Sequence, residues 1–316
     1  MGVMSRRGRS LLFLVASLLA GCADDGSSGV GGHGGAGGEA PSIPDFEVGG
    51  DRPTTVQAPP GYRKDQPAPL IVLLHGYGAT GFLEDVYFKL SAVAKARGAF
   101  FVAPDGTLDA KTRGFWNASD ACCNFGGVDV DDSTYLMGLV DEIASKVSID
   151  PKRVYFVGHS NGAFMAHRMA CEHADRIAAI VTLAGETWLD TSLCQPTEPV
   201  SVLAIHGTAD LTIDFDGGSD LGVEAGFGPS PAYPSEMITD AMWAERDGCA
   251  PAPTAGTPLD LEVSLDGAET RVSSWEDCDA GANVTLWKIE GAGHIPSFYY
   301  YATDDIADWL FAHPKE

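Results

Sequence analysis

The sequence has few basic residues and no long apolar run. Lys and Arg number 20 against 44 Asp and Glu, which gives a formal net charge of −24 at pH 7. Such a negative field disfavours binding to nucleic acid and to anionic membrane surfaces. The most apolar stretch, residues 11–20, is too short to span a bilayer, because a transmembrane helix needs about 20 apolar residues. We therefore expect no nucleic-acid partner and no membrane-spanning segment.

The sequence also lacks the usual metal-binding spacings. No Cys-x-x-Cys pair with partner histidines occurs, although such pairs are typical of zinc sites. The acidic groups at 129–132 and 214–220 do not follow the spacing of an EF-hand calcium loop. The first group fits the start of a helix, where carboxylates accept from free backbone N–H groups. We expect no metal site.

The N-terminus has the layout of an export signal. Arg6, Arg7 and Arg9 precede the apolar residues 11–20, as in a signal peptide. The leader ends in Leu19-Ala20-Gly21-Cys22, which resembles a bacterial lipobox, where the cysteine is lipidated. We expect a lipoprotein signal peptide over 1–21, lipidation of Cys22, and an outer-membrane or cell-surface location. An ordinary secretory signal, giving a secreted or periplasmic protein, is the alternative.

The segment after the leader has the composition of a linker. Residues 22–49 are rich in Gly, Ser, Ala and acidic residues and cannot bury much apolar surface. We expect a flexible tether over 22–49 that leads to one catalytic domain over 50–316.

Six further cysteines remain in this domain. An even number in an exported chain suggests disulfides, although the sequence alone allows many pairings. The pairs nearest in sequence are the ones we predict, and the two adjacent cysteines would form a vicinal bridge. The predicted pairs are Cys171–Cys194, Cys249–Cys278 and Cys122–Cys123.

The most informative stretch is 154–162. Four β-prone apolar residues lead into Gly158-His159-Ser160-Asn161-Gly162, and a segment of helical composition follows. A strand, a sharp turn and a helix with serine at the apex form the nucleophile elbow of hydrolases. Glycines on both sides let the strand and the helix pack closely. We expect Ser160 to be a nucleophile; a glycine-rich turn in another kind of α/β protein is the alternative.

Apolar runs of strand length alternate with helical segments along the domain. Such continuous runs are typical of parallel strands that are covered on both faces, and their alternation with helices predicts a mainly parallel central sheet with helices on both faces. Together with the elbow, this pattern predicts an α/β-hydrolase fold. The main predicted strands are 70–74, 99–103, 154–157, 177–183, 201–205 and 284–289.

A serine nucleophile needs a base, and the base needs an orienting acid. In α/β-hydrolases the chain order is serine, acid, histidine. His294 stands in a glycine-rich loop after a predicted strand, and Asp210 follows the preceding parallel strand. We expect Ser160, Asp210 and His294 to form the catalytic triad, with Asp214 as the second choice for the acid.

The loops at other strand ends supply candidates for the rest of the site. The loop His75-Gly76-Tyr77-Gly78 can turn backbone N–H groups toward a developing oxyanion, so we expect Tyr77 and Asn161 to form the oxyanion hole. Trp116 and Trp188 also follow strand ends, where α/β sheets bind ligands. We expect both to line the substrate pocket. For Trp116, packing within its loop is an equal alternative.

Several motifs are spaced along the domain. They are Leu73-Leu74-His75-Gly76-Tyr77-Gly78, Trp116-Asn117 followed by Cys122-Cys123, Gly158-His159-Ser160-Asn161-Gly162, Ile205-His206-Gly207-Thr208-Ala209-Asp210, Gly248-Cys249 and Gly293-His294. In this order they resemble the secreted polyhydroxybutyrate depolymerase and feruloyl esterase group, which is close to carbohydrate esterase family 1. The resemblance covers about residues 50–312 and implies an α/β-hydrolase esterase without a cofactor, with the triad named above. Two departures are Ala163, where the group often has a second glycine, and the residues after His294, where it often has His-x-Trp-Pro-Gly.

These features predict a serine carboxylic-ester hydrolase that acts through an acyl-enzyme. The expected substrate is a small-molecule or polymer ester: a feruloyl or acetyl ester of a polysaccharide, or a short polyhydroxyalkanoate. A serine peptidase of prolyl-oligopeptidase type shares the elbow, but no sequence of propeller length is present. A non-catalytic, surface-tethered binding protein on a hydrolase scaffold is the alternative from another class. The oligomeric state is not predicted.

Overall fold

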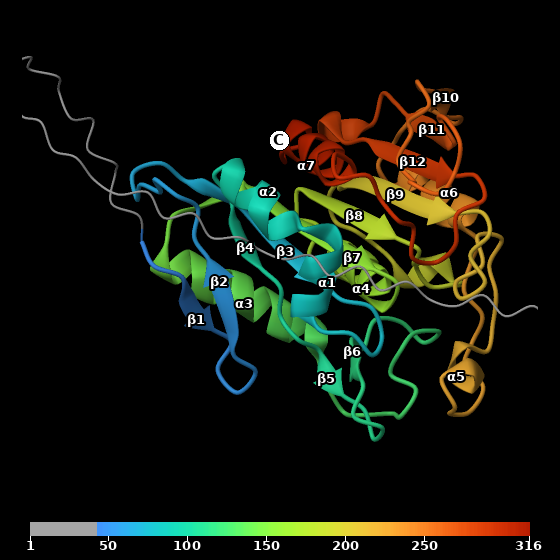
Figure 1. Cartoon of the computed structure of the whole chain (residues 1–316), viewed down its shortest axis with the longest axis horizontal. Coiled ribbons are helices and arrows are strands. Elements are labelled where there is room, and N and C mark those ends of the chain that lie inside the picture. Colours follow the sequence, from blue (N-terminus) through green and yellow to red (C-terminus); the bar gives the residue numbers. More distant parts are fainter. Residues whose placement is uncertain (1–42) are drawn as a thin grey trace, which may run out of the picture. The chain divides into compact units, whose positions relative to one another are not determined.

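The computed structural model describes residues 43–316 (Figure 1). The predicted signal peptide, Cys22 and most of the predicted tether lie outside the described residues. The tether prediction is wrong at its end, because Phe46–Val48 forms strand β1, which pairs antiparallel with β2 (Thr54–Gln57). Val48 is buried, so the folded domain begins before residue 50. No helix within the described residues is long and apolar enough to cross a membrane.

A ten-stranded sheet forms the centre of the domain (Figure 1). Its six middle strands are parallel, and its edges are antiparallel, which confirms the predicted α/β-hydrolase architecture. A second, two-stranded sheet pairs β5 (Thr107–Leu108) with β6 (Gly114–Phe115). In spatial order the large sheet contains β1, β2, β4 (Phe100–Val102), β3 (Ala68–Leu74), β7 (Ile149–His159), β8 (Ala179–Leu183), β9 (Ser201–Gly207), β12 (Val284–Ile289), β11 (Thr270–Trp275) and β10 (Thr254–Ala255).

Helices cover both faces of the sheet, because the apolar residues of each central strand alternate between two cores. In β3, Leu70, Val72 and Leu74 face one core, and Ile71 and Leu73 face the other. The first core includes residues of α3 (Asp132–Lys146), α4 (Asn161–Glu172) and α6 (Glu236–Arg246). The second includes residues of α1 (Gly81–Phe88), α2 (Leu90–Ala96) and α7 (Ala302–Ala312). The short helices are α5 (Leu221–Glu224), η1 (Thr191–Leu193) and η2 (Asp279–Gly281).

Three disulfides link segments of the domain. Cys171–Cys194 joins the end of α4 to the segment before β9, and Cys249–Cys278 joins the segment after α6 to the one before β12. The third joins the adjacent residues Cys122 and Cys123. These are the pairs expected from the sequence. Each of the two longer links stabilises the fold by about 3 kcal/mol, mainly because it restricts the unfolded chain.

The turn between β7 and α4 depends on two glycines. A Cβ atom on Gly158 would overlap the backbone of Gly162 and Ala163, and one on Gly162 would overlap the carbonyl group of Leu74. All of these neighbours are backbone atoms, so none can move aside as a flexible side chain would. The strand and the helix can approach this closely only without Cβ atoms.

We expect Gly158→Ala to lower the free energy of unfolding by about 3 kcal/mol or more, because the overlap forces the elbow apart. Urea unfolding followed by circular dichroism measures the change. The matched control is Gly138→Ala in α3, where a Cβ atom would contact nothing within 4 Å. Alanine there should raise stability by about 0.5–1 kcal/mol. Equal stability changes in the two variants would contradict the close-packing argument.

Candidate active site

Ser160 occupies the sharp turn between β7 and α4. Its φ and ψ angles are 54° and −122°, a backbone conformation that a non-glycine residue adopts only when its surroundings hold it there. Its N–H donates to the carbonyl oxygen of Leu183 at 2.7 Å. The side chain is half-buried at the carboxyl end of the sheet. This position is the one predicted for a nucleophile.

Asp210 and His294 meet across neighbouring strands. They follow β9 and β12, which pair in parallel, and the imidazole Nδ1 lies 2.7 Å from Asp210 Oδ2. The other carboxylate oxygen accepts from the backbone N–H groups of Thr212 and Ile213. Burial alone would raise the pKa of Asp210, but the nearby imidazoles and these N–H groups hold it below its usual value. The ionised carboxylate therefore accepts from Nδ1–H, which leaves the Nε2 lone pair of His294 free to act as a base.

Ser160 and His294 line the same pocket, which has a volume of about 240 Å³. Among the described residues no hydrogen bond joins the Ser160 hydroxyl to the His294 ring, as is common in ligand-free hydrolases, where the contact tightens on substrate binding. Burial is the main cause that lowers the pKa of His294 below its ordinary value, although Asp210 opposes the shift. The second choice for the acid, Asp214, accepts from the N–H of Asp216. Among the described residues, no hydrogen bond or ion pair joins Asp214 to His294.

A buried pair fixes the loop that carries His294. His159 Nε2 lies 3.1 Å from the carbonyl oxygen of His294, and its Nδ1 lies 3.2 Å from Glu84 Oε1. The second oxygen of Glu84 accepts from the N–H of Gly76 at 3.0 Å. This chain of contacts connects the base loop to the loop after β3. The sequence predicts neither contact, since no spacing relates Glu84 to the elbow; the position of His159 within the elbow is the available signal.

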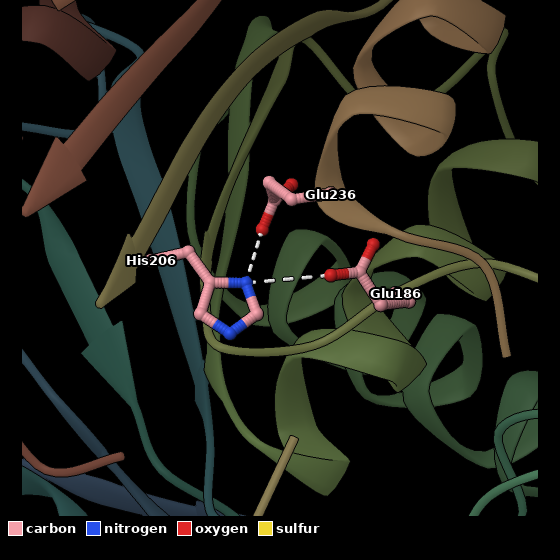
Figure 2. Close-up of side chains that lie close together, drawn as sticks. All are labelled: Glu186, His206 and Glu236. Carbon is pink, nitrogen blue, oxygen red and sulfur yellow. Dashed lines mark hydrogen bonds and ion pairs between the residues drawn. The ribbon is translucent and has the colours of Figure 1, made fainter. Parts of the chain in front are cut away.

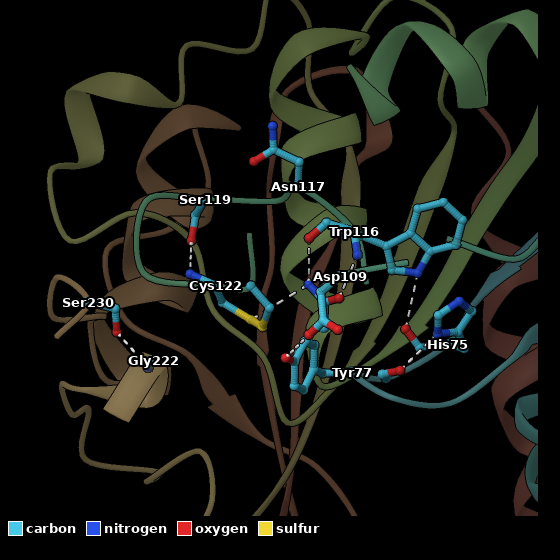
Figure 3. The surroundings of a disulfide bond; sticks show 12 residues. His75, Tyr77, Asp109, Trp116, Asn117, Ser119, Cys122, Gly222 and Ser230 are labelled. Atoms are coloured by element: carbon cyan, nitrogen blue, oxygen red, sulfur yellow. Dashed lines mark hydrogen bonds between the residues drawn. A yellow bond between two sulfur atoms is a disulfide. The ribbon is translucent and has the colours of Figure 1, made fainter. Parts of the chain in front are cut away.

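The two predicted oxyanion donors lie at adjacent strand ends. Within residues 43–316, the backbone N–H groups of Tyr77 and Asn161 donate to no protein group. The Asn161 side chain is fixed by two hydrogen bonds to the backbone of Trp116, at 2.7 and 2.9 Å. The Tyr77 hydroxyl donates to Asp109 (Figure 3). Both residues are thus held in place, and their backbone N–H groups have no protein acceptor among the described residues.

Trp116 does not line the pocket, so that prediction is wrong. Its side chain is fully buried, and its indole N–H donates to the carbonyl oxygen of His75 at 3.1 Å (Figure 3). The Trp116 side chain thus supports the loop that follows β3. His75 also has a structural role, since its ring contacts the Gly76 carbonyl and the Gly106 N–H.

Trp188 is likewise absent from the two pockets that contain Ser160. It is half-buried and packs against the core on the α4 face. The prediction for Trp188 is therefore also wrong. Both tryptophans follow strand ends, but their side chains turn toward the core, a direction that sequence position does not reveal.

A second pocket of about 330 Å³ also reaches Ser160. Its apolar lining includes Tyr77, Phe125, Ile213 and Leu221. The last two belong to the Gly- and Pro-rich segment 211–233, whose length is typical of a site-flanking loop. Phe125 was not singled out from the sequence, although it is an aromatic residue two positions after the vicinal cysteines.

Comparison with known proteins identifies the family of the chain. The chain is 28% identical to feruloyl esterase B of Piromyces equi over 246 residues, which cover 77% of the chain but only 42% of that protein. It is 26% identical to feruloyl esterase D of Neurospora crassa, with 94% of this chain and 91% of the relative covered. The structure of acetyl xylan esterase from Aspergillus awamori superposes with a TM-score of 0.57 at 18% identity, covering 84% of this chain and 98% of that one. The model of the alpha/beta hydrolase family matches residues 71–311, and the chain therefore belongs to that family.

Proposed function

We propose that this protein is a serine carboxylic-ester hydrolase with Ser160 as nucleophile, His294 as base and Asp210 as orienting acid. The observation that carries the proposal is the 2.7 Å hydrogen bond that joins the buried Asp210 to His294, a residue that lines the same pocket as Ser160. The relatives named as feruloyl esterases support the same reaction class.

The proposed reaction proceeds through an acyl-enzyme. Ser160 Oγ attacks the ester carbonyl carbon while His294 Nε2 takes its proton. The N–H groups of Tyr77 and Asn161 donate to the oxyanion of the tetrahedral intermediate. This intermediate collapses, and His294 returns the proton to the leaving alcohol. Water then attacks the acyl-enzyme by the same route and releases the acid, while Asp210 remains ionised throughout.

For the substrate, we propose an aromatic acyl group of the feruloyl type. The 330 Å³ pocket beside Ser160 contains the rings of Tyr77 and Phe125 together with the aliphatic side chains of Ile213 and Leu221. Such a lining suits a flat aryl group, because aromatic rings stack or meet edge to face. The alcohol, a sugar in a polysaccharide ester, would leave through the 240 Å³ pocket beside His294.

We also propose that the protein is exported and tethered through a lipid on Cys22. The three disulfides support an oxidising compartment. The lipobox-like sequence before Cys22 supports the anchor. Incorporation of labelled palmitate by the native sequence, but not by Cys22→Ala, would support the anchor; equal labelling would contradict it.

The nucleophile is tested with a fluorophosphonate probe and p-nitrophenyl acetate. We expect wild-type protein to hydrolyse the ester and to be labelled once, at Ser160. Ser160→Ala should lose label and lower kcat by about 10⁴-fold or more, because the acyl-enzyme cannot form. Ser145→Ala, an exposed serine on α3, is the control and should behave as wild type. Labelling of Ser160→Ala at the wild-type rate would rule out the assigned nucleophile.

The pH profile tests the base. His294 must be neutral to accept a proton, and burial lowers its pKa below the ordinary value of 6.5. We therefore expect kcat/KM for p-nitrophenyl acetate to stay constant from pH 8 downward and to fall only below pH 6.5. Asp210→Asn should lower kcat by about 10⁴-fold and move the acid limb to lower pH, since the carboxylate no longer stabilises the imidazolium. An acid limb centred above pH 7 would contradict the assignment.

The acyl pocket is tested with methyl ferulate, acetylated xylan and hydroxybutyrate oligomers. We expect methyl ferulate to give the highest kcat/KM. Phe125→Ala should lower that value about tenfold, because it removes a ring that contacts the aryl group. The same variant should change kcat/KM for p-nitrophenyl acetate by less than about threefold, since acetate does not fill the pocket. Faster turnover of either of the other two substrates would refute the aromatic acyl assignment.

A further inference from the structure

A buried cluster of acidic side chains surrounds His206 on β9 (Figure 2). Glu186 follows β8, and Glu236 is the first residue of α6. One atom from each of these three side chains lies within 4.8 Å of the others, and each side chain is at most 1% exposed. His206 Nδ1 lies 2.6 Å from Glu236 Oε2 and 3.4 Å from Glu186 Oε1. Asp240 is also buried and stands one helical turn after Glu236, on the same face of α6.

The cluster has more acceptor oxygens than the protein satisfies. Among the described residues, Glu186 Oε1, Glu236 Oε1 and both carboxylate oxygens of Asp240 have no hydrogen-bond partner. None of the ion pairs in this part of the chain joins these three residues to Lys or Arg. Buried carboxylates are costly unless a cation or a hydrogen-bond donor faces them. These buried carboxyl groups therefore need either bound protons or a bound cation.

The hydrogen bonds around the cluster orient its ligand atoms toward one point. His206 Nε2 lies 2.9 Å from the carbonyl oxygen of Ile213, and Nδ1 lies 2.6 Å from Glu236 Oε2, so both ring nitrogens face acceptors and carry protons when no metal is bound. A metal ion at the cluster would take the place of the Nδ1 proton and leave the Nε2 proton on the Ile213 carbonyl. Thr239 Oγ1 donates to Glu186 Oε2 at 2.5 Å, which leaves Oε1 directed at His206 (Figure 2). Histidine and carboxylate ligands of metals are usually held by such outer contacts.

We propose that Glu186, His206 and Glu236 bind a divalent transition metal ion, Zn²⁺, through one atom of each side chain. Ligand atoms of a tetrahedral zinc site lie about 3.4 Å apart, which matches the separation of His206 Nδ1 and Glu186 Oε1. Glu236 Oε2 needs to move outward by less than about 1 Å. The imidazole nitrogen favours zinc over calcium or magnesium. The sequence predicts no metal site, because these ligands come from three distant segments without a shared spacing.

The ion would fix the loop that carries the catalytic acid. His206 Nε2 lies 3.4 Å from Asp210 Oδ2, and the residue that accepts from His206, Ile213, donates its own N–H to Asp210. A metal on Nδ1 would hold the ring in the tautomer that makes these contacts. The site is structural, so its existence does not depend on the proposed esterase reaction.

The test measures metal content and thermal stability of the full protein. After refolding with excess Zn²⁺ and exhaustive dialysis, we expect about one zinc per chain by inductively coupled plasma mass spectrometry. Removal of zinc by dipicolinate should lower Tm by at least about 5 °C, because an ion that binds only the native state stabilises it. Added Zn²⁺ should restore Tm, and Ca²⁺ should not. Both readouts are independent of ester hydrolysis.

A double variant and a matched control complete the test. Glu186→Gln with Glu236→Gln should retain less than a tenth of the zinc and should not respond to dipicolinate. Asp247→Asn replaces another buried carboxyl group with an unpartnered oxygen outside the cluster, and it should bind zinc as wild type does. Wild-type protein with less than 0.1 zinc per chain and no Tm response to dipicolinate would overturn the proposal and assign protons to the carboxyl groups. That measurement needs no variant, so a double variant that fails to fold does not obscure the result.

Discussion

The site depends on the close approach of β7, β3 and the first turn of α4. Gly158 and Gly162 permit this approach, because backbone atoms occupy the space of their missing side chains. The approach holds Ser160 at a positive φ angle and brings Asn161 beside the end of β3. Asn161, the proposed oxyanion donor, uses its side chain to fix the Trp116 loop. One steric constraint therefore sets the positions of the proposed nucleophile, a proposed donor and a neighbouring loop together.

Parallel pairing of β9 and β12 brings the proposed acid and base together. Asp210 and His294 are separated by 84 residues in the chain, but β9 and β12 are neighbours in the sheet, so their carboxyl ends place the two loops side by side. The His159 and Glu84 contacts then tie the base loop to the opposite side of the elbow. The proposed acid and base are thus held in place by contacts to the backbone as well as by the hydrogen bond between them.

The sequence predicts the features that rest on periodicity and on motifs. Continuous apolar runs such as 70–74 reveal the buried parallel strands, and Gly-x-Ser-x-Gly marks the turn at Ser160. The sequence does not reveal side-chain direction, so Trp116 and Trp188 were wrongly assigned to the pocket, whereas Phe125 was overlooked. It also misses β1, because the glycines after Val48 resemble a continuing linker. The Glu186, His206 and Glu236 cluster escapes prediction for the same reason as any long-range contact: only the fold brings its members together.

Two separate pockets open onto Ser160, one beside His294 and one beside Phe125. In the proposed acyl-enzyme, the retained half of the ester would occupy one pocket while the departing half vacates the other. Hydrolytic water can then enter along the vacated route without displacing the bound half. Mutations can also change the two pockets independently, so an enzyme of this kind can accept many alcohols and still be strict in its choice of acyl group.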